Sequence, residues 1–437
     1  MSLPVFFEKT QAAVIDATAA GAVLRYDPAW RQDGAAIPLS LTMPLTETEH
    51  PPEVVTPWLM NLLPEGEPLR AMTRAIGIAR EDVLGLIAQT GRDLAGAFTV
   101  GRSRPQESPG FTPIAASADF ERIIEELPAR QFLVGEDGVS MSLAGAQDKL
   151  PLAMRGGDLA IPTGGAASTH ILKPDNPRLP GSVQNEALCM VLARRCGLSV
   201  ADVTTHQAGQ RDYLLVTRYD RLVHGEQVSR LHQEDLCQAL GRPPAAKYQH
   251  NQSGVLGPSL ADLFGLLRAH MTARDINRLL DAVIFNIAIG NVDSHAKNYS
   301  ILLAAAGRAE LAPLYDLMSG LDWPNITENH AQDVGGQRRG RHIYGRHWRR
   351  MAKETGLAGP GALRRVRQVV ERVLGQLPAA ASEVAAMPAG AGARLARFEA
   401  AIAERARLVL DHAAVEGPAE PDAPADENAA PAASAYA

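Results

Sequence analysis

The chain has 437 residues, of which 46% are hydrophobic, 21% charged and 5% aromatic. This composition is that of a globular protein with two or three domains, and it excludes a collagen, a disordered chain and a disulfide scaffold. The 43 basic and 49 acidic side chains leave a net charge of -6, so any contact with nucleic acid requires a local basic patch or a partner protein.

Residues 1–105 are expected to form a small α/β module. They combine short apolar runs, such as 39–43, with stretches of helical spacing at 58–63 and 83–87. The segment 102–110 is rich in proline, serine and glycine, which predicts a linker or a surface loop.

Beyond this segment the apolar residues alternate with a period of two. This period at 139–143 and 150–154, with small residues at 144–146 between the two runs, predicts a hairpin with a small-residue tip. Further strands are predicted at 169–173 and 213–217.

Helical spacing dominates from about residue 234 onward. Helices are predicted at 186–195, 279–287, 363–377 and 395–409. Gly197 ends the first of them and Gly290 the second. The expected fold class is therefore α+β, with a mixed α/β amino-terminal half and a helical carboxy-terminal half. Residues 416–437 contain four prolines, five acidic side chains and neither lysine nor arginine, which predicts a disordered tail.

The cysteines and the amino terminus predict a cytoplasmic protein. Cys189, Cys196 and Cys237 form no CxxC pair, which indicates buried free thiols in a reducing compartment and argues against a zinc module. The first residues, MSLPVFFEKT, lack the pattern of a signal peptide, and no apolar run of 18 residues occurs. We therefore expect no membrane partner.

A cluster of polar residues at 290–298, GNVDSHAKN, separates an apolar helix from a predicted strand at 299–303. Core elements hold both ends of this loop, so it is a rigid platform for function. Asp293 is placed to take a proton from a nucleophile, and Asn298 offers an amide oxygen suited to a hard cation.

A hairpin of residues 299–303 and 310–314, centred near residue 307, is expected to bring Asp316 opposite Asn298. A carboxylate and an amide oxygen then converge beside Asp293, as a magnesium-nucleotide site requires. The alternative is that these polar residues only cap helices and turns.

The string SLAGAQDK at 142–149 joins the two strands of the predicted hairpin. Its small side chains allow backbone N–H groups to approach phosphate oxygens, although it matches neither GxxxxGK[ST] nor GxGxxG. Lys173 ends the next strand, as the phosphate-pairing lysine of kinases does, and Glu186 on the following helix is placed to hold it. The alternative is that Lys173 is a solvated lysine.

The chain resembles the HipA family, bacterial serine/threonine kinases that act as toxins of type II toxin–antitoxin pairs. The resemblance covers roughly residues 1–410 in the expected order. It rests on LSLTMPL (39–45), NLLPEG (61–66), GRDLAGA (91–97), SLAGAQDK (142–149), THILKP (169–174), HQEDLCQ (232–238), GNVDSHAKN (290–298) and LAPLYDLMS (311–319). The D-x-H-x-x-N string also resembles the catalytic loop of phosphoinositide-3-kinase-like enzymes.

This resemblance implies a two-lobed, protein-kinase-like fold of the phosphoinositide-3-kinase type with an all-helical carboxy-terminal lobe. The domains implied are an amino-terminal α/β subdomain at 1–105, a kinase N-lobe at 106–240 and a helical C-lobe at 241–415, followed by the tail at 416–437. The cofactors implied are ATP and Mg²⁺.

Site residues follow from the resemblance position by position. Asp293 is implied to be the catalytic aspartate, Lys173 to neutralise the ATP phosphates, and Asn298 and Asp316 to hold Mg²⁺. Ser142 corresponds to the family's autophosphorylated serine, and Asp148 stands where Glu is frequent. The other residues implied to bind the nucleotide are Leu143, Ala144, Gly145, Ala146, Gln147 and Lys149 of the Gly-rich string, Gln233, Glu234 and Leu236 of the hinge, and His295, Lys297 and Tyr315.

The partners implied are a helix-turn-helix antitoxin of the HipB type, operator DNA bound mainly through this antitoxin, and a protein substrate. For some members of the family this substrate is an aminoacyl-tRNA synthetase. One alternative is a pseudokinase that binds nucleotide and antitoxin without transferring phosphate. Another is a metal hydrolase that uses Asp293 and His295 with His330, Asp333, His342 or His347, although the sequence lacks HExxH.

A basic patch, defined by the arginines and histidines of residues 338–350, stands out in this acidic chain. It is either a solvated face or a contact for DNA, for an acidic substrate or for an RNA-bound synthetase.

Overall fold

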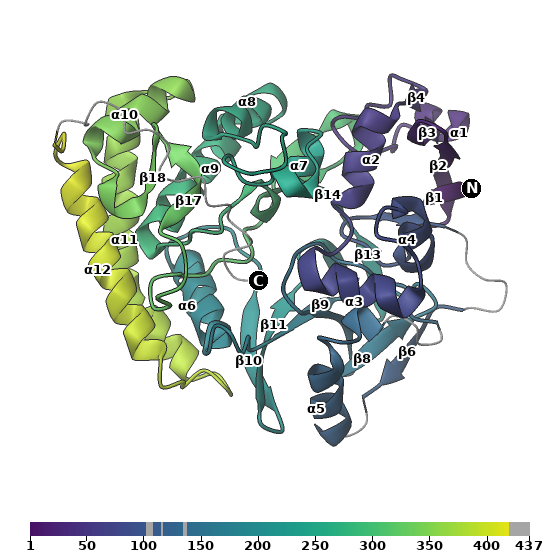
Figure 1. The fold of residues 1–437 in the computed structure, drawn as a ribbon, viewed down its shortest axis with the longest axis horizontal. Helices are drawn as coiled ribbons and strands as arrows, with labels where there is room; N and C mark the ends of the chain where they lie inside the picture. The colour runs from purple at the N-terminus through teal and green to yellow at the C-terminus, as the bar shows by residue number, and fades with distance from the viewer. Residues whose placement is uncertain (102–107, 115–116, 134–137, 419–437) are drawn as a thin grey trace. The chain divides into compact units, whose positions relative to one another are not determined.

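The computed structural model describes residues 1–101, 108–114, 117–133 and 138–418 (Figure 1). The chain forms two compact units, each assembled from separate stretches. Unit 1 comprises Met1–Asp175, Ala201–Pro244 and Ser300–Ala312, and unit 2 comprises Asn176–Val200, Ala245–Tyr299 and Pro313–Ala437. The division at residues 105, 240 and 415 assigns a continuous stretch to each domain, and it stays a prediction.

Unit 1 begins with an α/β module, as the sequence predicts. Its five-stranded antiparallel sheet has the order β4-β3-β2-β1-β5. The strands are β1 (Ser2–Phe7), β2 (Thr10–Thr18), β3 (Gly21–Tyr26), β4 (Glu49–His50) and β5 (Phe98–Val100). The helices are α1 (Pro28–Gln32), α2 (Pro52–Met60), α3 (Gly66–Ile76) and α4 (Val83–Thr90).

A second antiparallel sheet of unit 1 has the order β10-β11-β9-β7-β8-β6. Its strands are β6 (Gly110–Pro113), β7 (Leu150–Arg155), β8 (Asp158–Thr163), β9 (His170–Pro174), β10 (Val203–Ala208) and β11 (Arg211–Thr217), and α5 (Ser117–Glu126) follows β6. The predicted strands at 169–173 and 213–217 are thereby confirmed. Most of the predicted linker lies outside the described residues.

Smaller elements complete unit 1. β12 (Arg221–His224) pairs with β13 (Gln227–Arg230). β14 (His232–Asp235), β15 (Ser300–Leu303) and β16 (Ala309–Leu311) form a three-stranded sheet in that order, and α7 (Leu236–Ala239) follows β14. The hairpin predicted after the polar loop is therefore confirmed as β15 and β16.

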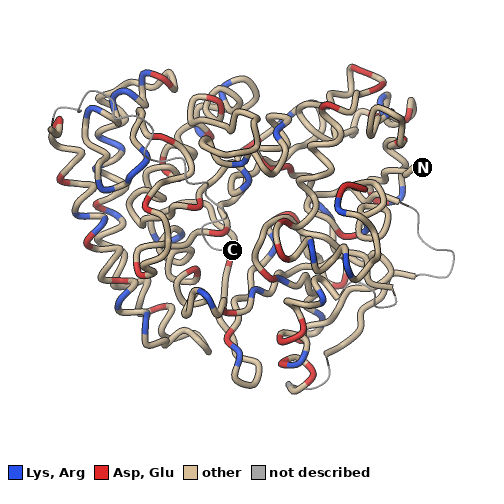
Figure 2. Tube along the Cα trace, in the orientation of Figure 1, with Lys and Arg blue, Asp and Glu red and all other residues tan. Residues whose placement is uncertain are grey.

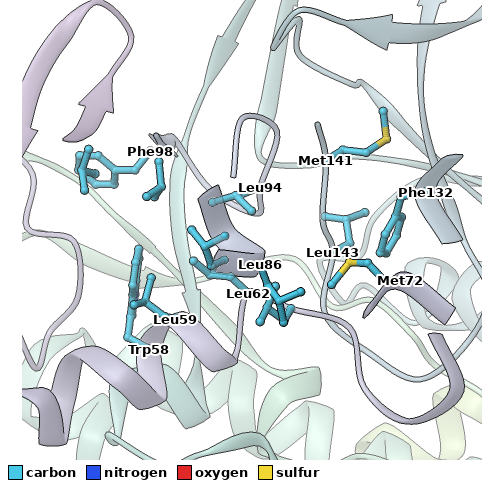
Figure 3. Close-up of a cluster of buried hydrophobic side chains, with 14 of the residues drawn as sticks. Trp58, Leu59, Leu62, Met72, Leu86, Leu94, Phe98, Phe132, Met141 and Leu143 are labelled. Carbon is cyan, nitrogen blue, oxygen red and sulfur yellow. The ribbon is translucent and has the colours of Figure 1, made fainter. Parts of the chain in front are cut away.

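The hairpin predicted at 139–143 and 150–154 is wrong. The first run forms no strand pair with β7; it lies parallel to other segments, with bridges from Met141 to Asp93 and from Gly145 to Pro64. Met141 and Leu143 are buried in the core of unit 1 (Figure 3). A period of two favours an extended segment, but it does not identify the segment that pairs with it, and here Met141, Ser142 and Leu143 are all buried.

Unit 2 is mainly helical. Its helices are α6 (Ser182–Arg195), α8 (Leu260–His270), α9 (Ala273–Ile289), α10 (Gly345–Glu354), α11 (Gly359–Ala385) and α12 (Leu395–Ala413). The long helix α11 packs against α6, α9, α10 and α12 (Figure 1). The four predicted helices are confirmed as α6, α9, α11 and α12, and the three cysteines are buried and free.

An all-helical carboxy-terminal lobe is not what the structure contains. In unit 2, β17 (Asn329–Val334) pairs with β18 (Gln337–Arg339), and β15 and β16 of the same half of the sequence fold with unit 1. The sequence predicts β15 and β16 but not β17 and β18, which have six and three residues, too few for a period of two to stand out against the helices around them. Residues 419–437 of the predicted tail lie outside the described part of the chain.

Candidate functional site

Asp293 lies in a buried loop between α9 and the short 3-10 helix η3 (Ala296–Asn298) of unit 2. Gly290 ends α9 with a φ of +69°, and a Cβ there would lie 2.5 Å from the Leu321 side chain, so glycine is required. The amide of Asp293 donates to Asn291 Oδ1 at 3.1 Å, and Asn291 Nδ2 donates to Asn286 Oδ1 at 3.0 Å. The helix before the loop therefore holds the aspartate in place.

The structure brings His295 and Asn298 to the same peptide. The carbonyl oxygen of Asp293 accepts hydrogen bonds from the amide of His295 at 2.7 Å and from Asn298 Nδ2 at 2.8 Å. Because the amide nitrogen of Asn298 is used by the loop, Oδ1 is the atom of this side chain that suits a hard cation. This geometry fits the predicted role in binding Mg²⁺.

His295 is a neutral, buried side chain. Burial lowers its pKa well below the usual value, and the nearby positive charges of Lys247 and Lys297 lower it further. Its Nδ1 atom is buried and has no hydrogen-bond partner among the described residues. A neutral imidazole nitrogen in this state suits a polar group of a ligand, as expected for a residue of the nucleotide pocket.

Tyr315, which precedes Asp316, contacts the loop by another route than the predicted strand register. The hairpin pairs Ile301 with Leu311, so its centre is residue 306, and a continued register would place Leu314, not Asp316, opposite Asn298. Beyond residue 312 the chain leaves the hairpin, and the amide of Leu314 donates to Ser199 O at 2.8 Å.

A side-chain hydrogen bond, and not strand pairing, attaches the segment after the hairpin to η3. The Tyr315 hydroxyl donates to the carbonyl oxygen of Lys297 at 2.6 Å, which attaches the segment of Asp316 to η3. Asp316 has a φ of +57°, in the left-handed region that costs free energy for residues other than glycine. Such strain at a carboxylate is typical of functional positions.

Two residues that the sequence analysis does not assign also contact this loop. The Tyr248 hydroxyl donates a hydrogen bond to Asp293 Oδ1. The carbonyl oxygen of Lys247 accepts from the amide of Ala296 at 3.2 Å. The two residues lie some 45 positions before Asp293 in a segment without periodicity, so no local pattern in the sequence distinguishes them.

In unit 1, the Gly-rich string is an extended segment that turns back on itself. The amide of Ser142 donates to Asp93 O at 3.1 Å, and its buried hydroxyl donates to Leu62 O at 2.9 Å. Lys149 Nζ donates to Ala144 O at 2.6 Å and closes the turn. Gly145 has a φ of +108°, and a Cβ there would lie 2.6 Å from Lys149 Nζ.

The predicted contacts of this string with a nucleotide involve its backbone rather than its apolar side chains. Leu143 is buried in the core of unit 1, so only its backbone is suited to contact a nucleotide. The roles assigned to Ala144, Ala146 and Gln147 remain predictions.

Lys173 is the buried penultimate residue of β9, and it is in register with Leu214 of β11. The strand lies between β11 and β7, so both of its edges are paired and the lysine has a fixed position. Glu186 lies on α6 in unit 2, and its pairing with Lys173 stays a prediction.

The predicted hinge is the edge strand β14 and the start of α7. Gln233 Oε1 accepts from the Tyr219 hydroxyl, and Glu234 Oε1 accepts from the amide of Leu41 at 2.8 Å. Leu236 is the buried first residue of α7, which is capped by Asp235. These side chains are engaged by the protein, so the backbone along the outer edge of β14 is the part suited to bind a base.

The buried side chain of Glu234 is expected to make the stability of the protein depend on pH. Burial raises its pKa to about 8, and hydrogen bonds from Ser40 and Leu41 oppose this rise only in part. Between about pH 4.5 and 8 the unfolded chain loses the proton that the folded chain keeps, so stability falls as pH rises, by about 1.4 kcal/mol per pH unit. We expect Glu234→Gln to remove this fall. From pH 6 to pH 8, the free energy of unfolding of this variant should rise by about 2 to 3 kcal/mol relative to that of the parent.

Urea unfolding at the two pH values measures this difference. The exposed carboxylate of Glu310 supplies the control Glu310→Gln, which should follow the parent. Identical pH dependence in the parent and in Glu234→Gln would show that the buried carboxyl group is not neutral.

Several side chains of the basic patch contact other residues of unit 2. Figure 2 shows basic and acidic positions interspersed along the chain. His347 is buried, and its Nδ1 accepts from the amide of Tyr344 at 2.9 Å. Arginines of the patch contact acceptors of the same unit: Arg341 contacts Glu328, Arg346 and Arg349 contact Glu416, and Arg350 contacts the carbonyl oxygen of Gly335. These contacts favour the interpretation as a solvated face, and a contact with nucleic acid stays a prediction.

The residues proposed for a metal hydrolase are dispersed. His330 Nδ1 lies 2.9 Å from Asn291 O, whereas Asp333 pairs with His250 at 2.9 Å. Among the described residues there is no group of three or more His, Cys, Asp or Glu side chains that could hold a metal ion. In the same part of the chain, no helix has the length and apolar character needed to cross a membrane.

Two family models match the chain. The model of the HipA-like C-terminal domain matches residues 141–380, and the model of the HipA N-terminal domain matches residues 3–101. The putative kinase Y4mE of Sinorhizobium fredii is 37% identical over 396 residues, which cover 88% of this chain and 92% of that protein.

A protein named as a kinase toxin is also similar. The serine/threonine-protein kinase toxin HipA of Shewanella oneidensis is 34% identical over 319 residues, which cover 70% of this chain and 71% of that protein. The solved structure of the Shewanella oneidensis HipA, HipB and operator DNA complex contains a chain that matches with a TM-score of 0.82 and 26% identity. This match covers 95% of the present chain and all of that one.

Proposed function

This chain belongs to the HipA family, and we propose from this premise that it is an ATP-dependent serine/threonine protein kinase. The observation that carries the proposal is the buried Asp293, which is held by Asn291 and Asn298 of its own loop and by the more distant Tyr248. A positioned carboxylate can accept the proton of a substrate hydroxyl while that oxygen attacks the γ-phosphate of ATP. The bond from the γ-phosphorus to the bridging oxygen then breaks, and ADP leaves.

Both units contain residues that are proposed to contact the nucleotide. In unit 1, Lys173 would neutralise phosphate charge, the backbone of 142–149 would approach the phosphates and the edge of β14 would bind the adenine. In unit 2, Asn298 and Asp316 are the residues that would hold Mg²⁺, and His295, Lys297 and Tyr315 line the pocket. When bound, the ion neutralises charge that develops on the transferred phosphoryl group.

Ser142 is the site at which we propose that the kinase modifies itself. Its hydroxyl is buried against the carbonyl oxygen of Leu62, so the segment must leave this position to be phosphorylated. A phosphate adds about 1.5 to 2 negative charges, which cannot return to a buried place beside a carbonyl oxygen. Autophosphorylation would therefore displace the Gly-rich string and switch the kinase off.

The proposed partners are a HipB-like helix-turn-helix antitoxin, operator DNA and a protein substrate. The match to HipA in a complex with HipB and operator DNA supports the first two. The net charge of -6 and the internally paired basic patch support DNA binding mainly through the antitoxin. We propose an aminoacyl-tRNA synthetase as the class of protein substrate. We also propose that the kinase acts in the cytoplasm.

The experiment that tests this function measures phosphate transfer from labelled ATP to the chain and to proteins of its host. We expect one phosphate per chain, on Ser142, and a loss of ATP affinity in the phosphorylated form. Ser142→Ala should abolish the self-labelling and still phosphorylate the substrate. The neighbouring Ser140, whose hydroxyl donates to Gln89 O at 2.7 Å, supplies the control Ser140→Ala, which should label like the parent.

Other outcomes separate the alternatives. ATP binding without phosphate transfer to any protein would indicate the pseudokinase. Full ATP affinity in a chain phosphorylated at Ser142 would refute the switch, although the kinase activity would stand.

A further inference from the structure

We propose that Tyr248 is a positioning residue that orients the carboxylate of Asp293 for catalysis. This inference rests on the proposed kinase function and adds to it a residue outside the loop. The contact that carries it is the hydrogen bond from the Tyr248 hydroxyl to Asp293 Oδ1, in which both side chains are buried.

The backbone around Tyr248 is held on both sides. The carbonyl oxygen of Lys247 accepts from the amide of Ala296, and that of Tyr248 accepts from Asn251 Nδ2 at 2.9 Å. The amide of Gln249 donates to Ala331 O of β17 at 3.0 Å. The hydroxyl therefore has a fixed direction toward the aspartate.

The ring of Tyr248 is held as firmly as its backbone. It meets the ring of His295 edge-on, with centroids 5.1 Å apart and planes at 85°. Lys247 Nζ lies 5.6 Å from the centroid of the same ring. Removal of the hydroxyl alone leaves these ring contacts intact, so phenylalanine is the suitable replacement.

A carboxylate needs such a partner because its terminal torsion is broad and close to two-fold. The bond at Oδ1 restricts this rotation and so determines where the other oxygen points. An acceptor hydroxyl must meet that oxygen within hydrogen-bond distance, and small errors in placement reduce the rate steeply. The tyrosine thus acts through Asp293 without touching ATP or substrate.

A second interpretation of the same contact is that the hydroxyl occupies the place of the substrate's hydroxyl and blocks it. A blocking group has to move away before each turnover. The buried and doubly anchored Tyr248 opposes such movement, which favours the positioning role. The two interpretations predict changes in activity of opposite sign.

The experiment compares the parent with Tyr248→Phe in the full chain, after a phosphatase has removed any phosphate on Ser142 from both proteins. We expect kcat for phosphate transfer to fall by about 10- to 100-fold, with KM for ATP unchanged within two-fold. The control is Tyr213→Phe, since Tyr213 is a buried tyrosine of unit 1 whose ring packs against Phe120 and His206. This variant should keep the activity of the parent.

A double variant shows whether the tyrosine acts through the aspartate. In an Asp293→Asn background, Tyr248→Phe should have no further effect on the residual rate, because the group that it positions is gone. Equal losses in both backgrounds, an unchanged kcat or a raised kcat would each overturn the positioning role. A parent chain that transfers no phosphate would instead refute the proposed function itself.

Discussion

Replacing Asp293 by asparagine should reduce phosphate transfer by about 10²- to 10⁴-fold, the usual contribution of a general base. The amide has the shape of the carboxylate and can still accept the bond from Tyr248, but it cannot take up the proton of the attacking hydroxyl. The loop should keep its fold, because its bonds to Asn298 and His295 use the backbone of residue 293. The loss should therefore appear in kcat.

Three measurements check this expectation. Intact mass of the protein made in cells should show phosphate on the parent and none on Asp293→Asn. Nucleotide affinity and the thermal midpoint should match those of the parent after a phosphatase has removed its phosphate. Glu310→Gln, which neutralises an exposed carboxylate on β16, should label normally. An Asp293→Asn chain that labels as fast as the parent would remove this residue from the mechanism.

Replacing Asp93 by asparagine should destabilise unit 1 by about 3 to 5 kcal/mol. Asp93 Oδ1 lies 3.1 Å from an Arg221 nitrogen and 3.5 Å from an Arg230 nitrogen, and Oδ2 lies 3.7 Å from Arg218. Asp220 is the second carboxylate of this cluster, 2.7 Å from Arg218 and 2.8 Å from Arg221. Without Asp93, Arg218 and Arg221 share the carboxylate of Asp220, and Arg230 loses its ion pair.

The charge state of Asp93 follows from the same contacts. Burial acts to raise its pKa, but Arg218, Arg221 and Arg230 outweigh burial, so the pKa is lowered. The stability that this carboxylate contributes is present above about pH 4 and is lost as pH falls through the lowered pKa. Asp93→Asn should therefore lose most at neutral pH and differ least from the parent in acid.

Thermal unfolding should show a midpoint lower by roughly 6 to 20 °C at pH 7. The double variant Asp93→Asn/Arg230→Gln removes one unpaired cation and should recover part of the loss, with a coupling free energy of about 1 kcal/mol or more. Additive effects would show that the two side chains do not interact. Arg25→Gln, at an exposed ion pair with Glu49, is the control and should change stability by less than about 1 kcal/mol.

The same cluster also holds the Gly-rich string. The backbone of Asp93 bonds to Ser140 and Ser142, so loss of its side-chain partners should loosen the string. Amide hydrogen exchange of residues 140–146 should be faster in Asp93→Asn than in the parent, even where both remain folded. Equal exchange rates would separate the cluster from the position of Ser142.

Features encoded over a short stretch could be predicted from the sequence. The helices α9, α11 and α12 follow from apolar residues at helical spacing, and the end of α9 follows from Gly290. The loop from Asp293 to Asn298 is equally local, because a helix and a strand bound it on either side. Family resemblance added the candidate roles, since eight strings in one order are far more specific than any one of them.

Features that depend on partners distant in sequence were decided by the tertiary structure alone. The period of two at 139–143 indicated an extended segment, yet the segment lies along Asp93 and Pro64 rather than in a hairpin. Asp316 approaches η3 through the Tyr315 hydroxyl, not through strand register. Tyr248 contacts Asp293 across 45 residues of chain. Periodicity reports which face of a segment is buried, whereas the identity of its neighbour is set by packing among all segments, which no local pattern contains.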